Sequence, residues 1–247
     1  TTHYFGNGFS KAFGIQYLDK DGKIKNPYQT SWGVSTRLIG SIIMVHGDDN
    51  GLVLPPYVAP IQIVIIPIKM NEPGVLEKAR ALKEELANAG YRVKLDDSDK
   101  TPGWKFSEYE MKGVPLRIEV GPKDLVNDSC MIHKRNDGTR TKYSLNGICD
   151  TVKELLATIH KEMYNAALKN LLANVTEVHT FEELKAVVDK GGYAKMMWCG
   201  DQACEDKIKE LTNATARCIP FDQVPFEDHC PICGKKAKYV VLFAKAY

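Results

Sequence analysis

Four of the seven cysteines in the chain form two short pairs, Cys199-x4-Cys204 and Cys230-x2-Cys233. Two such pairs on turns can present four thiolates to one Zn²⁺ ion in a tetrahedron, with each sulfur about 2.3 Å from the metal. Gly234, directly after Cys233, lets the backbone turn so that its N–H groups can reach the sulfurs. Because four cysteines leave no open coordination position, we expect a structural zinc site and not a catalytic one.

Disulfide bonds and unrelated free thiols are the alternatives to a zinc site. An odd number of cysteines, four of them with metal-like spacing, is typical of a reducing compartment and not of a secreted domain built on disulfides. His229 precedes Cys230 and is an alternative ligand. The other three cysteines lie in or beside apolar segments and are expected to be ordinary buried thiols: Cys130, Cys149 and Cys218.

A second group of residues that could take part in chemistry lies in the segment Thr30–Arg37, which reads TSWGVSTR. Gly33 permits a ligand to approach the backbone closely. Arg37, one turn into the helix that follows, can direct a planar cation at a phosphate or stack on a base. On residue types alone, the alternatives are a solvated or salt-bridged Arg37 and a Trp32 that packs in a core.

The elements that would position these side chains follow from the spacing of apolar residues. Before a boundary at Pro55-Pro56, the sequence predicts short strands, a turn at 19–22 and one amphipathic helix. One face of this helix is expected to be apolar, and it is formed by Val34, Leu38, Ile42 and Val45.

From about residue 59, strands alternate with helices, which predicts a mixed sheet covered by helices. The run 61–68 is almost continuously apolar, as in a strand buried on both faces. A helix over 75–89 is expected to end at Gly90, and a hairpin to turn at 136–138. The other expected elements are strands over 91–95, 116–120, 130–134 and 141–144 and a long helix over 151–173.

The last part of the chain begins with a helix signal at Thr180, where Glu183 completes a capping box. This helix is expected to stop at 191–192. The elements expected after it are a strand over 193–198, a helix over 205–211, a short strand near 218 and a final strand over 239–244.

Composition limits the classes of protein to be considered. The chain has 247 residues, enough for about two domains, and its 44% hydrophobic and 26% charged content is typical of a soluble globular protein. With a net charge of +2, any contact with nucleic acid must come from local clusters. No apolar run approaches the ~20 residues that cross a bilayer, and the start lacks a signal peptide, so we expect a cytoplasmic protein without membrane contact.

Two strings in the first part carry a resemblance to a known family. SWGVSTRLIGSIIMVHGDDNGLVLPP, over 31–56, resembles motif 3 of the class II aminoacyl-tRNA synthetases, in the form found in prolyl-tRNA synthetases of the archaeal and eukaryotic type. THYFGNGFSKAF, over 2–13, is similar to that family's TSHxLGxxFSKxF segment. Together with a start at Thr1 that lacks Met, the resemblance implies the C-terminal portion of such an enzyme, beginning inside its catalytic domain.

This resemblance implies roles for six residues of the first part. Arg37 would be catalytic, lying over the adenine of ATP and reaching its γ-phosphate, and further ATP contacts would come from Thr1 and Ser35. Proline has no side-chain donor or acceptor, so its pocket must select by shape. The residues that the resemblance assigns to the wall of this pocket are His3, Trp32 and Gly33.

The middle part resembles the anticodon-binding domain shared by prolyl-, threonyl-, glycyl- and histidyl-tRNA synthetases, above all in TPGWKFSEYEMKGVPLRIEVGPKDL, over 101–125. RNA loops are read by stacking on aromatic rings and by hydrogen bonds to base edges, and carboxylates suit the N–H donors of guanine. The candidates for reading the two guanines of the proline anticodon are Glu110, Arg117, Lys123 and Asp124. The alternative is a solvated face, and Trp104 is expected to pack.

The resulting expectation is a multi-domain α/β fold of α+β character. Residues 1–57 would be the C-terminal piece of the antiparallel class II catalytic fold, and 58–150 a mixed-sheet α/β anticodon-binding domain. Residues 151–247 would form a linker helix and a small α/β zinc-binding tail domain. In this family the C-terminal Tyr, here Tyr247, turns back toward the active site.

The resemblance implies a ligase that joins L-proline to tRNA(Pro) through prolyl-adenylate, with ATP and Mg²⁺ as well as structural zinc. It also implies a homodimer formed through the full-length catalytic domain. Because motifs 1 and 2 are not in this sequence, the isolated chain is expected to be inactive. A non-catalytic tRNA-binding module and a threonyl- or glycyl-type relative are the alternatives.

Overall fold

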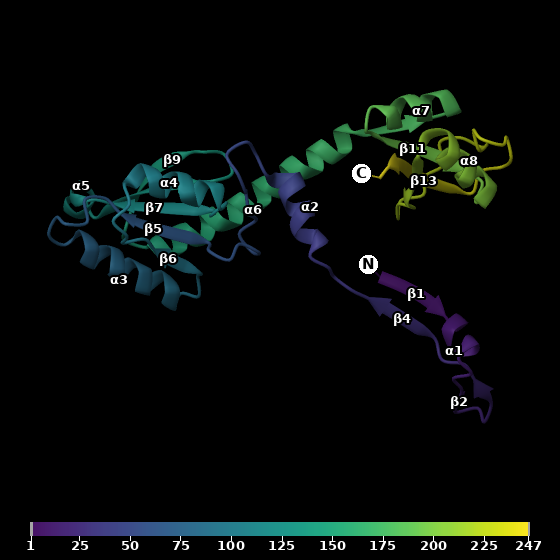
Figure 1. Cartoon of the computed structure of the whole chain (residues 1–247), viewed down its shortest axis with the longest axis horizontal. Coiled ribbons are helices and arrows are strands. Elements are labelled where there is room, and N and C mark those ends of the chain that lie inside the picture. Colours follow the sequence, from purple (N-terminus) through teal and green to yellow (C-terminus); the bar gives the residue numbers. More distant parts are fainter. Residues whose placement is uncertain (1, 247) are drawn as a thin grey trace. The chain divides into compact units, whose positions relative to one another are not determined.

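A computed structural model describes residues 2–246 of the chain, so Thr1 and Tyr247, which carry two of the expectations above, lie outside the described residues. The chain divides into two compact units, Thr1–His160 and Lys161–Tyr247. The boundary falls inside the long helix α6 (Ile148–Ala173), which can be followed in Figure 1. The domain boundaries expected at 57/58 and 150/151 stay predictions.

The first unit begins with short antiparallel pairs of strands. β1 (Thr2–Gly6) pairs with β4 (Gln29–Trp32), and β2 (Tyr17–Leu18) pairs with β3 (Ile24–Lys25) across the expected turn at 19–22. The two helices of this segment are α1 (Gly8–Ala12) and α2 (Arg37–His46).

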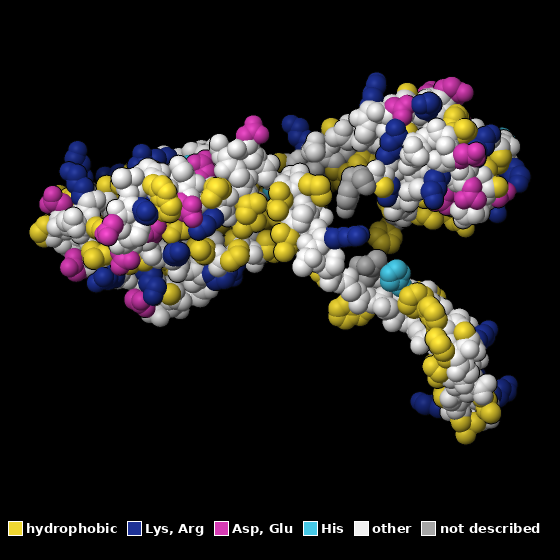
Figure 2. All heavy atoms as spheres, viewed as in Figure 1, with side chains coloured by type: hydrophobic (Ala, Val, Ile, Leu, Met, Phe, Trp, Pro, Cys, Tyr) yellow, Lys and Arg dark blue, Asp and Glu magenta, His cyan; other side chains and the backbone are white. Residues whose placement is uncertain are grey.

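This segment has almost no core of its own. Among residues 2–52, Ser10 is the only one classed as buried, and its hydroxyl donates to the carbonyls of Asn7 and Pro27 at 3.0 and 2.7 Å. The periodicity of residues 34–45 predicted the helix, but no residue of α2 is buried. Hydrophobic side chains therefore line the visible face of this segment in Figure 2.

A five-stranded mixed sheet forms the core of the first unit, in the order β6-β5-β7-β8-β9. The first three of these strands are parallel, and the last two form an antiparallel hairpin. The strands are β5 (Ile63–Pro67), β6 (Val93–Leu95), β7 (Leu116–Val120), β8 (Ser129–Lys134) and β9 (Arg140–Ser144). Every residue of β5 is buried, as its continuous apolar run predicted.

Helices cover β5 on both of its faces, and Figure 1 shows α3 and α4 on opposite sides of the sheet. α3 (Val75–Asn88) packs on β5 and β6, and Gly90, two residues after its end, has the left-handed conformation expected of a helix stop, with a φ of 91°. α4 (Pro102–Met111) packs Tyr109 against the opposite face of β5. On the side of the sheet where α4 lies, Arg117 and Glu119 of β7 are buried, whereas the side chains of β8 are half-buried and those of β9 are exposed.

The second unit is a mixed four-stranded sheet with the order β10-β11-β13-β12. Its strands are β10 (Val175–Val178), β11 (Tyr193–Trp198), β12 (Ala214–Cys218) and β13 (Tyr239–Lys245). α7 (Phe181–Asp189) and α8 (Gln202–Thr212) pack on it around a core that includes Phe243 and Met196. β10 was not expected from the sequence.

The expected cap of α7 is present. The backbone N–H of Glu183 donates to the Thr180 hydroxyl at 3.1 Å, and the Glu183 carboxylate accepts from the backbone of His179 at 2.7 Å. In the described part of the chain, no helix is both long enough and apolar enough to span a membrane.

Candidate nucleic-acid interface and metal centre

Polar side chains form two rows on the open face of the first unit's sheet. The strand register aligns Arg117 of β7 with His133 of β8, and His133 with Arg140 of β9. Two residues further along these strands, Glu119 and Lys142 belong to the next row. Residues i and i+2 of a strand share a face, so all five point to the side on which α4 lies. The exposed members of these rows, Arg140 and Lys142, are both cations, whereas Arg117 and Glu119 are buried.

Arg117 is the centre of this face. Its guanidinium carbon lies 4.0 Å from the centroid of the Phe106 ring on α4, and its Nε donates to the Glu119 carboxylate at 3.0 Å. Glu119 is only 2% exposed, and its second oxygen accepts from Arg140. A buried carboxylate requires compensating charge, which these two arginines supply. The result is a cation held rigidly beside an aromatic ring.

Glu110 lies near the end of α4, the helix that carries Phe106. It follows Phe106 by four residues, a spacing that puts both side chains on one flank of the helix. Burial, followed by the positive charge of Arg117, lowers the pKa of His133, and the Glu110 carboxylate opposes that shift. The charges of Glu110 and Arg117, both expected at one site, therefore both act on His133.

Lys123 and Asp124 lie on α5 (Pro122–Val126), directly after β7. The Lys123 side chain is exposed. One oxygen of Asp124 accepts from the backbone N–H of Gly121 at 2.9 Å and caps α5. Asp124 therefore has a structural task in addition to any contact with a ligand.

Sequence reasoning missed several members of this face. The hairpin residues could have been found from the alternation of polar side chains at every second position of the two strand segments. Nothing in the sequence indicated that Phe106 would lie under Arg117. The missed residues are Phe106, Glu119, His133, Arg140 and Lys142.

Trp104 does not pack in the core as expected. Its side chain is 48% exposed, and the ammonium of Lys100 lies 5.5 Å from the ring centroid. The next residue, Lys105, points into the protein instead and donates to the backbone carbonyl of Asp96 at 2.9 Å. The expectation was wrong because the helical phase turns Lys105 and Tyr109 inward, which leaves Trp104 at the surface.

The expected ATP and proline residues lie along β1, β4 and the start of α2. The backbone N–H of Arg37 donates to the Ser35 hydroxyl at 3.4 Å, which brings these two residues together. Trp32 is 79% exposed at the end of β4. It pairs with Thr2, and His3 pairs with Ser31, so strand alternation turns the side chains of His3 and Trp32 to opposite faces of the two-stranded ribbon.

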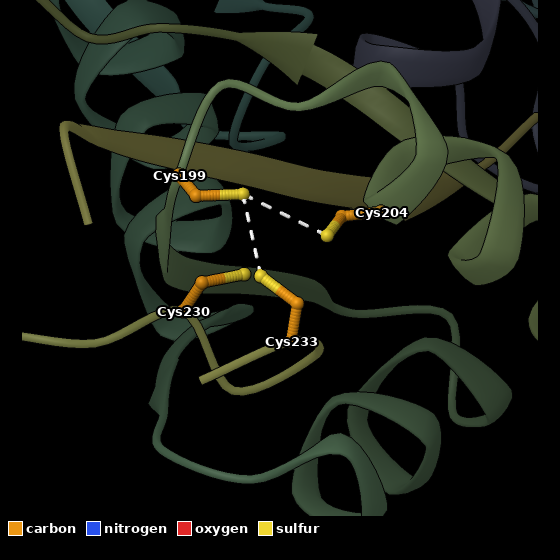
Figure 3. A group of neighbouring side chains, drawn as sticks. All are labelled: Cys199, Cys204, Cys230 and Cys233. Carbon is orange, nitrogen blue, oxygen red and sulfur yellow. Dashed lines mark hydrogen bonds between the residues drawn. The ribbon is translucent and has the colours of Figure 1, made fainter. Parts of the chain in front are cut away.

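The four predicted cysteine ligands meet at one point of the second unit, as Figure 3 shows. The sulfurs of Cys199, Cys204, Cys230 and Cys233 all lie within 4.8 Å of one another. The Cys199 sulfur is 3.6 Å from both Cys204 and Cys233. Sulfurs bound to one zinc at about 2.3 Å in a tetrahedron lie roughly 3.8 Å apart. The cluster therefore has the dimensions of a zinc site.

Antiparallel pairing brings the two halves of this cluster together. Cys199 follows the last residue of β11, Trp198, which pairs with Tyr239 at the start of β13. The second pair of cysteines lies on the loop just before β13, closed by a bond of 2.8 Å from the Gly234 N–H to the Cys230 carbonyl. Gly234 has a φ of 70°, so the expected turn after the last cysteine is present.

The thiols of this cluster differ in acidity. The backbone N–H of Lys235 lowers the pKa of Cys233, whereas burial raises the pKa of Cys204. A divalent cation between the sulfurs would stabilise their thiolate forms. His229 is not part of the cluster.

The three cysteines outside the cluster were all expected to be buried. The expectation of burial is met by Cys130, whereas Cys149 is half-buried and Cys218 is exposed. Cys218 was misplaced because it ends β12, which is the edge strand of its sheet.

Two segments match known family models. Residues 62–155 match the family described as "Anticodon binding domain". Residues 181–247 match the family described as "Prolyl-tRNA synthetase, C-terminal". The open sheet face lies in the first of these segments, and the four cysteines lie in the second.

The whole chain is also similar to curated proteins named "Proline--tRNA ligase". It is 54% identical over 248 aligned residues to one from Clostridium botulinum (strain Loch Maree / Type A3), and the match covers 100% of this chain and 52% of that protein. The proteins of that name from Lachnospira eligens and Lachnoclostridium phytofermentans are 52% identical over the same shares of both chains. The chain thus spans about half the length of the curated relatives it matches.

Proposed function

We propose that this chain is the C-terminal half of a proline–tRNA ligase, which activates L-proline with ATP and transfers it to tRNA(Pro). The observation that carries the proposal is the 54% identity to a protein of that name along the entire chain. Mg²⁺ accompanies ATP in this reaction, and we assign no residue of this half to it. The archaeal and eukaryotic type is the finer form of the proposal, and it rests on the strings over 2–13 and 31–56.

In this proposal, residues of the first 37 positions bind the small substrates. Arg37 contacts ATP and stabilises the negative charge that develops on its phosphates, with Ser35 and Thr1 as further ATP contacts. His3, Trp32 and Gly33 belong to the proline pocket, which must reach around the edge of the ribbon because His3 and Trp32 point to its opposite faces. The exposed side chains of Arg37 and Trp32 support these roles, because neither is used in a core of this chain.

The upstream half of the relatives supplies the rest of the active site. In this proposal, the exposed apolar side chains of residues 2–46 pack in the full-length protein against the part of the relatives that this chain does not cover. Motifs 1 and 2 and the contacts of a homodimer would lie there as well. The isolated chain is accordingly proposed to be inactive.

The open sheet face reads the anticodon in this proposal. The carboxylate of Glu110 accepts from the N1–H and N2 groups of a guanine, while the half-buried ring of Phe106, which lies on the buried Arg117 guanidinium, offers a surface for stacking. Lys123 contacts phosphate, and the oxygen of Asp124 that does not cap α5 is free to accept from a second guanine. The match of residues 62–155 to an anticodon-binding family supports this assignment.

In this proposal, one structural zinc ion is bound by four ligands, the thiolates of Cys199, Cys204, Cys230 and Cys233. The metal would join the end of β11 to the loop before β13 and stabilise the second unit. A cytoplasmic location agrees with the seven cysteines of the chain, none of which forms a disulfide bond.

The experiment that tests the function uses the full-length protein that contains this chain. ATP–pyrophosphate exchange is measured with proline, threonine and glycine, and charging with tRNA(Pro). Exchange that depends on proline alone, followed by charging, is the expected result. Exchange with threonine or glycine would favour the other relatives, and tRNA binding without exchange would favour a non-catalytic module.

A further inference from the structure

Arg135 joins two parts of the first unit to which we assign different tasks. It follows β8 directly and is only 5% exposed. Its two terminal nitrogens donate to both carboxylate oxygens of Asp48, at 2.7 and 2.6 Å. Its third nitrogen, Nε, donates to the backbone carbonyl of Glu110 at 2.9 Å. Such bidentate, charge-assisted bonds are among the strongest and most directional in proteins.

Asp48 belongs to the turn that ends α2, the helix that begins with Arg37. The helix stops at His46, and Asp48 then exchanges two backbone hydrogen bonds of 3.1 Å with Gly51. The backbone N–H of Asn50 donates to the Asp48 carboxylate at 2.9 Å. The carboxylate that Arg135 binds is therefore fixed to the end of the proposed ATP-binding helix.

The chain after this turn packs directly on the end of α4. The Leu52 N–H donates to the Met111 carbonyl at 2.9 Å. A Cβ atom on Gly51 would lie 2.6 Å from the Met111 backbone, and one on Gly113 would lie 2.7 Å from Leu52. Close packing of this kind transmits displacements instead of absorbing them. A movement at the Glu110 end of α4 should therefore also displace the turn at Asp48.

We propose that Arg135 is a positioning residue that couples occupation of the anticodon face at Glu110 to helix α2, through its ion pair with Asp48. The inference rests on the proposed function. A guanine bound by the Glu110 carboxylate acts on the same residue whose carbonyl Arg135 binds. Coupling of this kind requires that the two sites bias one shared element, and the shared element here is the Asp48–Arg135 junction.

The test uses Asp48→Asn in the full-length enzyme. This change removes the negative charge of Asp48 and leaves the hydrogen bond from Arg135 to the Glu110 carbonyl in place. Asp49→Asn is the matched control, because Asp49 is exposed and adjacent. Charging is measured with native tRNA(Pro) and with transcripts in which either anticodon guanine is replaced, and ATP–pyrophosphate exchange is measured without tRNA.

For Asp48→Asn we expect kcat for charging native tRNA(Pro) to fall roughly tenfold, a size typical of coupling between sites. The KM for tRNA and the tRNA-independent exchange should stay within about twofold of wild type. The factor by which guanine replacement lowers kcat should shrink. Asp48→Glu, which restores the charge, should recover part of the loss, and Asp49→Asn should behave as wild type.

Two results would overturn the coupling. One is an equal kcat for Asp48→Asn and Asp49→Asn. The other is a loss in Asp48→Asn that is the same for native and guanine-replaced tRNA, as a mere structural brace would produce. If instead the wild-type enzyme charges native and guanine-replaced tRNA equally well, the proposed anticodon role itself fails, and the coupling fails with it.

Discussion

The guanidinium of Arg117 and the ring of Phe106 form a stacked pair on the open sheet face, with the guanidinium carbon 4.0 Å from the ring centroid. Glu119 fixes the same guanidinium through its Nε, so the pair is held in place before any ligand binds. A preorganised cation and ring of this kind suit a base that is unstacked from an RNA loop.

Phe106→Ala should weaken tRNA binding by the full-length enzyme. A ring that stacks on a base contributes about 1–3 kcal/mol, so the KM for tRNA(Pro) should rise roughly tenfold while proline-dependent exchange is spared. Trp104→Ala is the control, because Trp104 is an exposed aromatic residue on the opposite flank of the same helix. Equal effects of the two changes would contradict the assignment.

Glu110→Ala combined with Lys123→Ala should lower charging of tRNA(Pro) and leave adenylate formation intact. The first change removes the proposed acceptor for guanine and the second a proposed phosphate contact, so kcat/KM for tRNA should fall about 100-fold if each contributes near 1.4 kcal/mol. Glu108→Ala with Lys112→Ala removes an ion pair from the other flank of α4 and serves as the control. Unchanged charging would remove the anticodon role.

Arg37→Ala should abolish proline-dependent ATP–pyrophosphate exchange in the full-length enzyme. Loss of one charge-stabilising donor costs about 100- to 1,000-fold in kcat. Arg37→Lys keeps the charge but not the planar fork, and it should restore only a small part of the activity. Near-normal exchange in Arg37→Ala would refute the ATP contact.

Metal analysis of the purified chain should find about one zinc ion per molecule, as four cysteine ligands bind one ion. Cys199→Ser should release the metal and lower the thermal stability of the second unit, followed by near-UV circular dichroism. Cys218→Ser is the control, because Cys218 is exposed and lies outside the cluster. A chain that contains no zinc when purified without chelators would rule out the site.

Gly113→Ala should destabilise the first unit more than Gly90→Ala does. Both glycines have positive φ, 69° and 91°, but only Gly113 has a neighbour within 4 Å of the added carbon, the backbone of Leu52 at 2.7 Å. Overpacking adds about 2 kcal/mol to the backbone strain that both share. Urea unfolding of the two variants measures the difference, and equal midpoints would show that the contact at Leu52 yields without cost.

Local patterns in the sequence determined much of the fold. The apolar run over 61–68 predicted β5, and the Thr180–Glu183 spacing predicted the cap of α7. The spacing of the cysteines predicted the group of four sulfurs. These predictions succeed because periodicity, caps and turns depend on residues a few positions apart, whose geometry the backbone conformation sets.

Only the tertiary structure decided which distant residues meet. Arg117 and Arg140 share Glu119 because of the register of β7, β8 and β9. Arg135 reaches Asp48, 87 positions away in the chain, because the turn after α2 packs on the end of α4. Contacts between elements that are distant in the chain depend on which elements pack together and on the shapes of their surfaces, which local patterns do not encode. The sequence alone therefore predicted the cysteine cluster, whereas only the tertiary structure revealed that Phe106 lies on Arg117 and that Arg135 binds Asp48.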